Sequence, residues 1–121
     1  MKKKLFLWLP VVLWMGVIFT FSSQPDLPSN QIDILDFALK KTAHMVEFGI
    51  LTFLFFTAFR YQKLQAGSLL SLSYAFTDEI HQLFVPGRGG RLSDVLIDSL
   101  GIFIVSRVIT SFIIPRIENK D

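Results

Sequence analysis

Long apolar runs alternate with short polar segments along this chain of 121 residues. The runs cover about residues 5–21, 42–59, 66–84 and 92–114, and each is long enough to cross a bilayer as a helix. The first run, for example, would rise about 25 Å as a helix, close to the thickness of the hydrocarbon core. The pattern therefore predicts an all-α transmembrane bundle of four helices, in a single domain over residues 1–121.

Polar segments separate the runs: the first and third are rich in proline, glycine or small polar residues, and the second is short and basic. They cover residues 22–30, 60–63 and 85–91, which predicts three connections. Residues 32–39 mix apolar side chains with two aspartates, a pattern that fits an interfacial helix before the second span. Pro115 is expected to end the fourth helix, because proline cannot continue the helical hydrogen bonds.

The composition supports a membrane protein. About half of the residues are hydrophobic and 13 are Phe, which is more apolar surface than a soluble domain of this size can bury. The first run also fits a cleaved signal peptide, but its length and the absence of a clear cleavage site favour an uncleaved span. The absence of cysteine excludes disulfides, a thiol nucleophile and cysteine metal ligands.

The distribution of Lys and Arg predicts the orientation of the helices. Basic residues are more frequent in the two terminal segments and the 60–63 turn, which share one side of the predicted bundle, than in the connecting segments on its other side. Because cytoplasmic segments are enriched in basic residues, this bias favours both termini in the cytoplasm, N-in and C-in. The first group is Lys2, Lys3, Lys4, Arg60, Lys63, Arg116 and Lys120, and the second is Lys40, Lys41, Arg88 and Arg91.

Ionisable residues concentrate at one end of the predicted bundle. Antiparallel packing brings the start of the second span, the end of the third and the start of the fourth to the outer third of the bilayer. Charged groups are costly in hydrocarbon and usually functional there. We therefore expect an outward-facing polar pocket between these three helices. Ser71 and Tyr74, further along the third span, are expected to make interhelical hydrogen bonds instead.

The polar residues at this end fall into two groups by their chemistry. The candidates for acid–base catalysis are Glu79 and Asp78, as general acid or base, and His81 and His44, as proton carriers. Arg88 and Arg91 are expected to bind an anionic group, and Ser93 is also expected to cap the fourth helix. The candidate ligand-binding residues are Lys41, Glu47, Gln82, Arg88, Arg91, Ser93, Asp94 and Asp98.

Four motifs in this region closely resemble the VanZ-like family of small bacterial membrane proteins. The motifs are Lys41-x-x-His44-x-x-Glu47-Phe48, the stretch 78–88 (DEIHQLFVPGR), Ser93-Asp94-Val95 and Asp98-x-x-Gly101. The resemblance implies a multi-pass protein of the bacterial cytoplasmic membrane. It also implies a link to resistance against the glycopeptide teicoplanin. Many members of the family have Asn where this chain has Asp98.

The sequence leaves several functions open. One is an enzyme that acts on an anionic lipid-linked or cell-envelope ligand, and another is a non-catalytic module that binds a headgroup or an amphiphilic drug. A metal-dependent membrane hydrolase is a further alternative, although the chain has no HExxH motif. A transporter is disfavoured, because four short helices leave little room for alternating access. The lipid bilayer is the expected partner, no nucleic-acid partner is expected, and no cofactor or oligomeric state is indicated.

Overall fold

Four long helices make up most of the described structure. The computed structural model describes residues 2–24 and 34–120, and these residues contain helices and no strand. The all-helical prediction is therefore confirmed for this part of the chain. The elements are α1 (Lys2–Ser22), α2 (Ile34–Ala58), α3 (Leu64–Gln82), α4 (Leu92–Val108), the π-helix η1 (Ile109–Ile113) and α5 (Ile114–Glu118).

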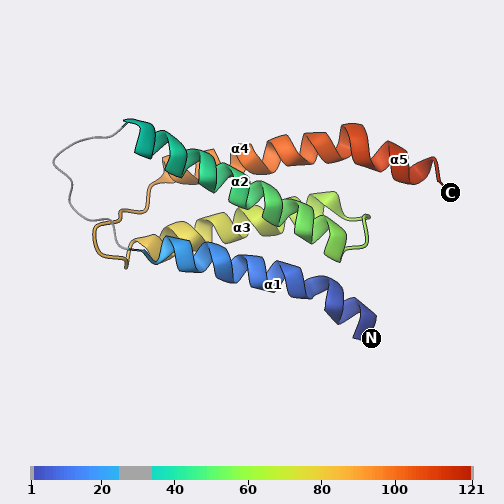
Figure 1. Cartoon of the computed structure of the whole chain (residues 1–121), viewed down its shortest axis with the longest axis horizontal. Helices are drawn as coiled ribbons and strands as arrows, with labels where there is room; N and C mark the ends of the chain where they lie inside the picture. The colour runs from blue at the N-terminus through green and yellow to red at the C-terminus, as the bar shows by residue number, and fades with distance from the viewer. Residues whose placement is uncertain (1, 25–33, 121) are drawn as a thin grey trace.

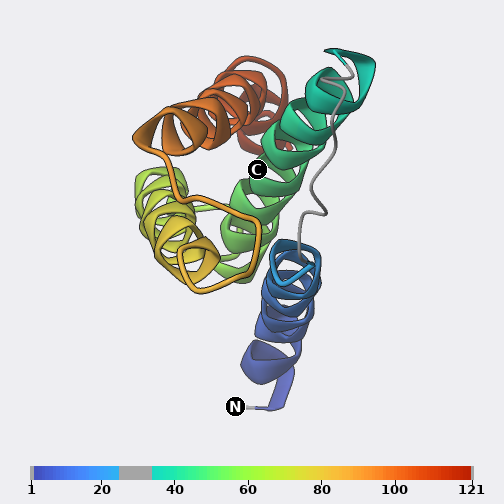
Figure 2. The ribbon, with the colours of Figure 1, turned by 90° about the vertical axis from the view of Figure 1, so that its left-hand side faces the viewer.

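The helices run antiparallel along the long axis of the molecule (Figure 1). Helix α2 is central and packs against α1, α3 and α4. Seen from the end, α1 and α4 lie on opposite sides of it (Figure 2). The end of α1, the start of α2 and the 83–91 turn lie at the same end of the bundle, whereas both chain termini lie at the other end (Figure 1).

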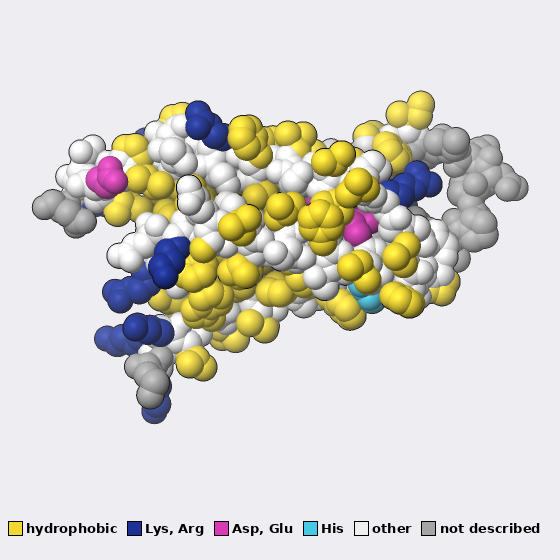
Figure 3. Space-filling model, turned by 180° about the vertical axis from the view of Figure 1, so that it is seen from behind, with side chains coloured by type: hydrophobic (Ala, Val, Ile, Leu, Met, Phe, Trp, Pro, Cys, Tyr) yellow, Lys and Arg dark blue, Asp and Glu magenta, His cyan; other side chains and the backbone are white. Residues whose placement is uncertain are grey.

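Apolar side chains cover much of the outer surface (Figure 3). Phe6 is 72% exposed and Phe84 is 82% exposed, values that fit contact with lipid rather than with water. Two segments, Lys2–Ser22 and Leu92–Glu118, are long and apolar enough to cross a membrane. Helices α2 and α3 are not among the segments that are long and apolar enough to cross a membrane by this measure.

Interhelical hydrogen bonds and buried apolar side chains hold the helices together. The indole of Trp14 on α1 donates to the Glu47 carbonyl oxygen on α2, at 2.9 Å. The Tyr74 hydroxyl on α3 donates to the Met15 carbonyl oxygen on α1, at 2.7 Å. Thr52 on α2 donates to the Ser71 hydroxyl at 3.0 Å, so the predicted interhelical roles of Ser71 and Tyr74 are confirmed. Around them the core contains Val11, Ile18, Phe48, Leu51, Phe55, Ala58, Ala75, Val95 and Ile102.

The structure corrects the predicted interfacial helix. Residues 34–40 are exposed, but they belong to the continuous helix α2, which extends from Ile34 to Ala58. The first residues of the predicted interfacial segment, 32 and 33, lie outside the described residues. An unbroken helix costs less than a break here, because the segment contains no proline or glycine that would release its backbone hydrogen bonds.

The structure also corrects the predicted end of the fourth helix. Pro115 lies inside α5, near its first residue, and the helical path continues to Glu118. The five residues before α5 form the π-helix η1. Proline has no N–H to donate, and its ring clashes with the carbonyl of the preceding turn. The wider π turn before Pro115 accommodates both effects, so the chain stays helical through the proline.

Candidate functional site

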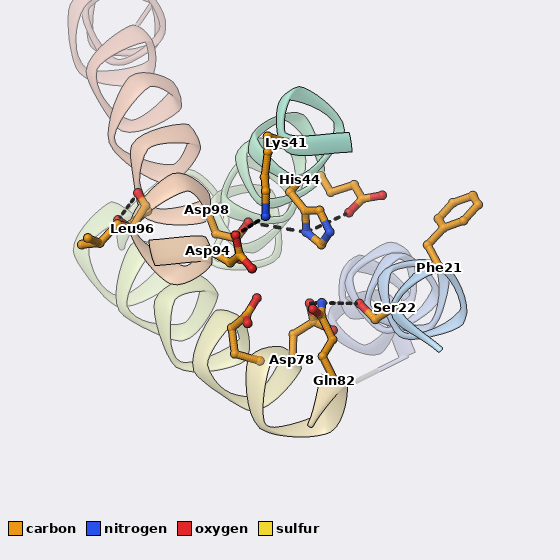
Figure 4. A network of polar contacts seen from close by, with 12 residues as sticks. Phe21, Ser22, Lys41, His44, Asp78, Gln82, Asp94, Leu96 and Asp98 are labelled. Atoms are coloured by element: carbon orange, nitrogen blue, oxygen red, sulfur yellow. Dashed lines mark hydrogen bonds and ion pairs between the residues drawn. The ribbon is translucent and has the colours of Figure 1, made fainter. Parts of the chain in front are cut away.

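Side chains from all four long helices converge at the end of the bundle opposite the termini (Figure 4). In the close-up, Ser22 on α1, His44 on α2, Gln82 on α3 and Asp98 on α4 point toward a common centre. We call this group the polar cluster. It consists of Ser22, Lys41, His44, Glu47, Asp78, Gln82, Asp94 and Asp98.

Helix α2 contributes three residues at intervals of three, which places them on one broad face. Lys41 forms an ion pair with Asp94 on α4. His44 Nδ1 lies 3.6 Å from Asp98 Oδ1 and 3.9 Å from Glu47 Oε2. These two distances are too long for hydrogen bonds but short enough for electrostatic attraction to an imidazolium. His44 therefore lies between two carboxyl groups from different helices.

Asp98 is the most buried member of the polar cluster. Its exposed fraction is 0%, and neither carboxyl oxygen has a hydrogen-bond partner among the described residues. His44 Nδ1 is likewise buried without a hydrogen bond. Buried polar atoms are nearly always paired, and an unpaired one costs about 1–3 kcal/mol. This corner of the cluster can therefore accept hydrogen bonds that the protein itself does not supply.

Helix α3 is linked to α1 through Gln82. The Gln82 amide donates to Asp78 Oδ2 at 3.1 Å, and its nitrogen lies 3.5 Å from the Ser22 hydroxyl oxygen. Ser22 is 1% exposed. Sequence reasoning assigned Ser22 to a connecting loop and missed this role. The only signal was its position directly after an apolar run.

Glu79 lies beside the polar cluster and supports the turn that follows α3. Its Oε2 accepts a hydrogen bond of 2.9 Å from the backbone N–H of Arg91, while Oε1 is buried and has no partner in the part of the chain that the structure describes. Arg91 is exposed and contributes this contact through its backbone, not its guanidinium. Ser93 is exposed and lies inside α4, whose N-cap is Arg91 without a side-chain hydrogen bond. The predicted capping role of Ser93 is therefore wrong.

His81 faces α1 rather than His44. Its ring stacks on Phe19, with ring centroids 4.3 Å apart, and its Nε2 lies 2.9 Å from the Ser23 hydroxyl oxygen. His81 follows Asp78 by three residues, so part of the turn that carries Asp78 faces α1. The two histidines, which the sequence grouped as proton carriers, thus occupy different environments.

Arg88 binds the C-terminal end of α1. Its Nη1 donates to the Ser22 carbonyl oxygen at 3.1 Å and lies 3.4 Å from the Phe21 carbonyl oxygen. The last carbonyl groups of a helix lack intrahelical partners and carry partial negative charge, so a guanidinium is favourable there. The structure thus gives Arg88 an anchoring contact with α1, and its ligand-binding role stays a prediction.

Replacing Arg88 with Met is expected to loosen the contact between α1 and the 83–91 turn. Charged hydrogen bonds of this kind stabilise by about 1.5–3 kcal/mol when buried, and Arg88 is half-buried, so we expect a loss of about 1–2 kcal/mol. Thermal unfolding in detergent measures this loss. The matched control is Arg91→Met, which removes an exposed guanidinium of the same turn. Equal unfolding temperatures for the two variants would contradict the anchoring role.

Carboxylates outnumber cations in and beside the polar cluster. Lys41 and Arg88 are the cations, and both interact with groups of the protein. Within residues 2–24 and 34–120, no group of three or more His, Asp or Glu side chains is arranged to hold a metal ion. Most of the side-chain atoms here without a hydrogen bond within the described residues are carboxyl oxygens, which accept hydrogen bonds when ionised. The carboxylates are Glu47, Asp78, Glu79, Asp94 and Asp98.

Comparison with known proteins supports the resemblance seen in the motifs. A family model described as VanZ/LLP1 matches residues 7–113, which is most of the chain and includes every candidate site residue. No curated protein and no solved structure matches the chain. The predicted family is therefore confirmed: the chain is a membrane protein that belongs to the VanZ/LLP1 family.

Proposed function

We propose that this protein crosses the bacterial cytoplasmic membrane four times, with both termini in the cytoplasm. Two observations support this orientation. Lys2, Lys3 and Lys4 start α1 at the end of the bundle that carries both termini, and Lys and Arg gather at that end (Figure 3). The polar cluster lies at the opposite end. With the basic end in the cytoplasm, the polar cluster opens toward the outer face.

The polar cluster then acts as an acid–base site on a lipid-linked or cell-envelope ligand. The observation that carries this proposal is the buried carboxylate of Asp98, which has no hydrogen-bond partner among the described residues and faces His44 Nδ1 at 3.6 Å. A histidine held by a carboxylate is a common general acid–base arrangement. A small approach of the two side chains would let Nδ1–H donate to Asp98, which leaves Nε2 to exchange a proton with the ligand.

The charges of the site define the ligand that it suits. The interior of the cluster has spare acceptors, so a hydroxyl or other donor of the ligand fits beside Asp98. Lys41 has three N–H donors and uses one for Asp94, so it can also bind an anionic group of the ligand. Arg88 and Arg91 are less suited to this task, because Arg88 binds α1 and Arg91 is exposed outside the cluster.

A second candidate function is a module that binds the same ligand without breaking a bond. The contacts of Glu79 and Asp78, the two acids expected to be catalytic, favour this second function, because both side chains are used in contacts within the protein. Glu79 accepts from the Arg91 N–H, and Asp78 accepts from Gln82. A catalytic role therefore depends on His44, whereas a binding role depends on the cluster as a whole.

Substitution of Asp98 separates function from stability. Asp98→Leu removes an unpaired buried carboxylate and is expected to raise the free energy of unfolding by about 1–3 kcal/mol while it abolishes function. Asp98→Asn keeps an oxygen acceptor for His44, and we expect it to retain function. Thermal unfolding in detergent and the cellular assay described below measure the two effects. A functional Asp98→Leu variant would contradict the role of the Asp98–His44 pair.

Production of the protein in a teicoplanin-sensitive bacterial host tests the proposed function in cells. We expect the minimal inhibitory concentration of teicoplanin to rise above that of the empty host, because the ligand belongs to the cell envelope. The control is a host that produces the Asp98→Leu variant at the same level in the membrane. Equal inhibitory concentrations for wild type and empty host would contradict a resistance role.

A further inference from the structure

An apolar groove runs along the outside of the contact between α2 and α4. It encloses about 400 Å³ and is lined by residues between Met45 and Phe53 on α2 and between Gly101 and Ile113 on α4 and η1. The groove exists because α2 and the α4–η1–α5 segment approach closely near Gly49 and Gly101 and then diverge (Figure 1). Every residue of this lining is either glycine or has an apolar side chain.

The size of the groove fits one hydrocarbon chain. From Gly101 to Ile113 the helix rises about 18 Å. The groove follows this length as an open channel of about 400 Å³, so an extended hydrocarbon chain can lie along it. The far wall includes η1, and π-helical turns are frequent at functional sites.

The outer end of the groove leads to the Lys41–Asp94 ion pair. Met45, in the groove lining, follows Lys41 by four residues, and Gly101 follows Asp94 by seven. These spacings put the ion pair on the same helical faces as the groove, about one to two turns further toward the outer end. The groove and the polar cluster therefore share the Lys41–Asp94 pair as a border.

We propose that this groove binds the chain of a ligand that carries one long hydrocarbon chain and a phosphate at its head. The chain lies between α2 and α4, and the phosphate lies at Lys41, where the ammonium has donors beyond the one used by Asp94. This inference rests on the proposed function and names its ligand class. It explains how a small bundle holds a lipid-linked ligand with its polar part beside His44 and Asp98.

Photochemical labelling tests the groove directly. The purified protein is placed in phosphatidylcholine vesicles that contain a long-chain alkyl monophosphate with a diazirine near the end of the chain. After irradiation, mass spectrometry locates the adducts. We expect them on groove residues such as Ile50, Phe53 and Val108. Adducts spread evenly over the apolar surface, including the exposed Leu96 and Leu100 outside the groove, would overturn the proposal, since bulk lipid would produce that result.

A pair of tryptophan variants provides the matched control. Ile104 lines the groove and Leu100 does not, yet the two are 46% and 48% exposed on the same helix. Ile104→Trp fills the groove and is expected to lower labelling about fivefold or more, whereas Leu100→Trp leaves it unchanged. Equal labelling of both variants would overturn the proposal.

Two further variants separate the head of the ligand from the proposed chemistry. Lys41→Gln is expected to lower labelling by the alkyl phosphate but not by an alkyl alcohol of the same length, and an equal effect on both probes would overturn the phosphate assignment. His44→Gln is expected to retain the groove labelling. If the groove is labelled but His44→Gln keeps its function, the acid–base site is contradicted and the groove proposal is not. If the groove is not labelled but His44→Gln loses its function, the groove proposal is contradicted and the acid–base site is not.

Discussion

Replacing Gly101 with alanine is expected to push α4 away from α2 and to destabilise the protein more than the other variants proposed here. A Cβ at position 101 would overlap the carbonyl oxygen of Met45, which is a backbone atom and cannot rotate away. Overpacking of this kind costs about 1–3 kcal/mol, and we expect the upper end of that range because backbone must move. Thermal unfolding and the yield of monodisperse protein in detergent measure the effect.

Gly16→Ala is the matched control for this prediction. A Cβ at Gly16 on α1 would meet no atom of the described residues within 4 Å, so alanine there adds helix propensity without a clash. We expect this control to be neutral or more stable by up to about 1 kcal/mol. If Gly101→Ala were as stable as Gly16→Ala, the close approach of α2 and α4 would be contradicted.

Replacing His44 with Gln is expected to abolish the proposed function while the fold is retained. Glutamine keeps a polar side chain of similar length but cannot exchange a proton near neutral pH. Loss of a general acid or base lowers a rate by about 10²–10⁴-fold. In the cellular assay, the teicoplanin inhibitory concentration of the variant should fall to that of the empty host.

His81→Gln is the control, because this chain has two histidines and His81 lies outside the polar cluster against Phe19. Its loss should remove one ring contact and one hydrogen bond and leave function intact. If His81→Gln abolished function and His44→Gln did not, the site would have to be assigned to the Ser23–His81 contact. Equal function of both variants would favour the non-catalytic binding module.

The helices and the end of the bundle that holds the polar residues could be predicted from sequence. The apolar runs fix the number of long helices, and short connections make neighbouring helices antiparallel. This places the start of α2, the end of α3 and the start of α4 together. The bias of Lys and Arg toward the other end gave the proposed orientation.

The partners within the site could not be predicted, because they depend on the rotation of each helix and on its neighbours. Arg88 and Arg91 are three residues apart, yet one binds the end of α1 and the other is exposed. Both lie in the turn after α3, where Gly87 adopts a φ of 77°, a conformation that favours glycine. Ser22 was missed because its role exists only once α1 packs beside α3.

The central claim is that the polar cluster acts on a cell-envelope ligand through His44. The most direct test is mass spectrometry of the organic extract of purified wild-type, His44→Gln and His81→Gln proteins, compared with the lipids of the same membranes. We expect an envelope amphiphile that is enriched on the protein and that accumulates unconverted on His44→Gln but not on His81→Gln. Extracts that match the bulk membrane lipids in all three proteins would contradict it.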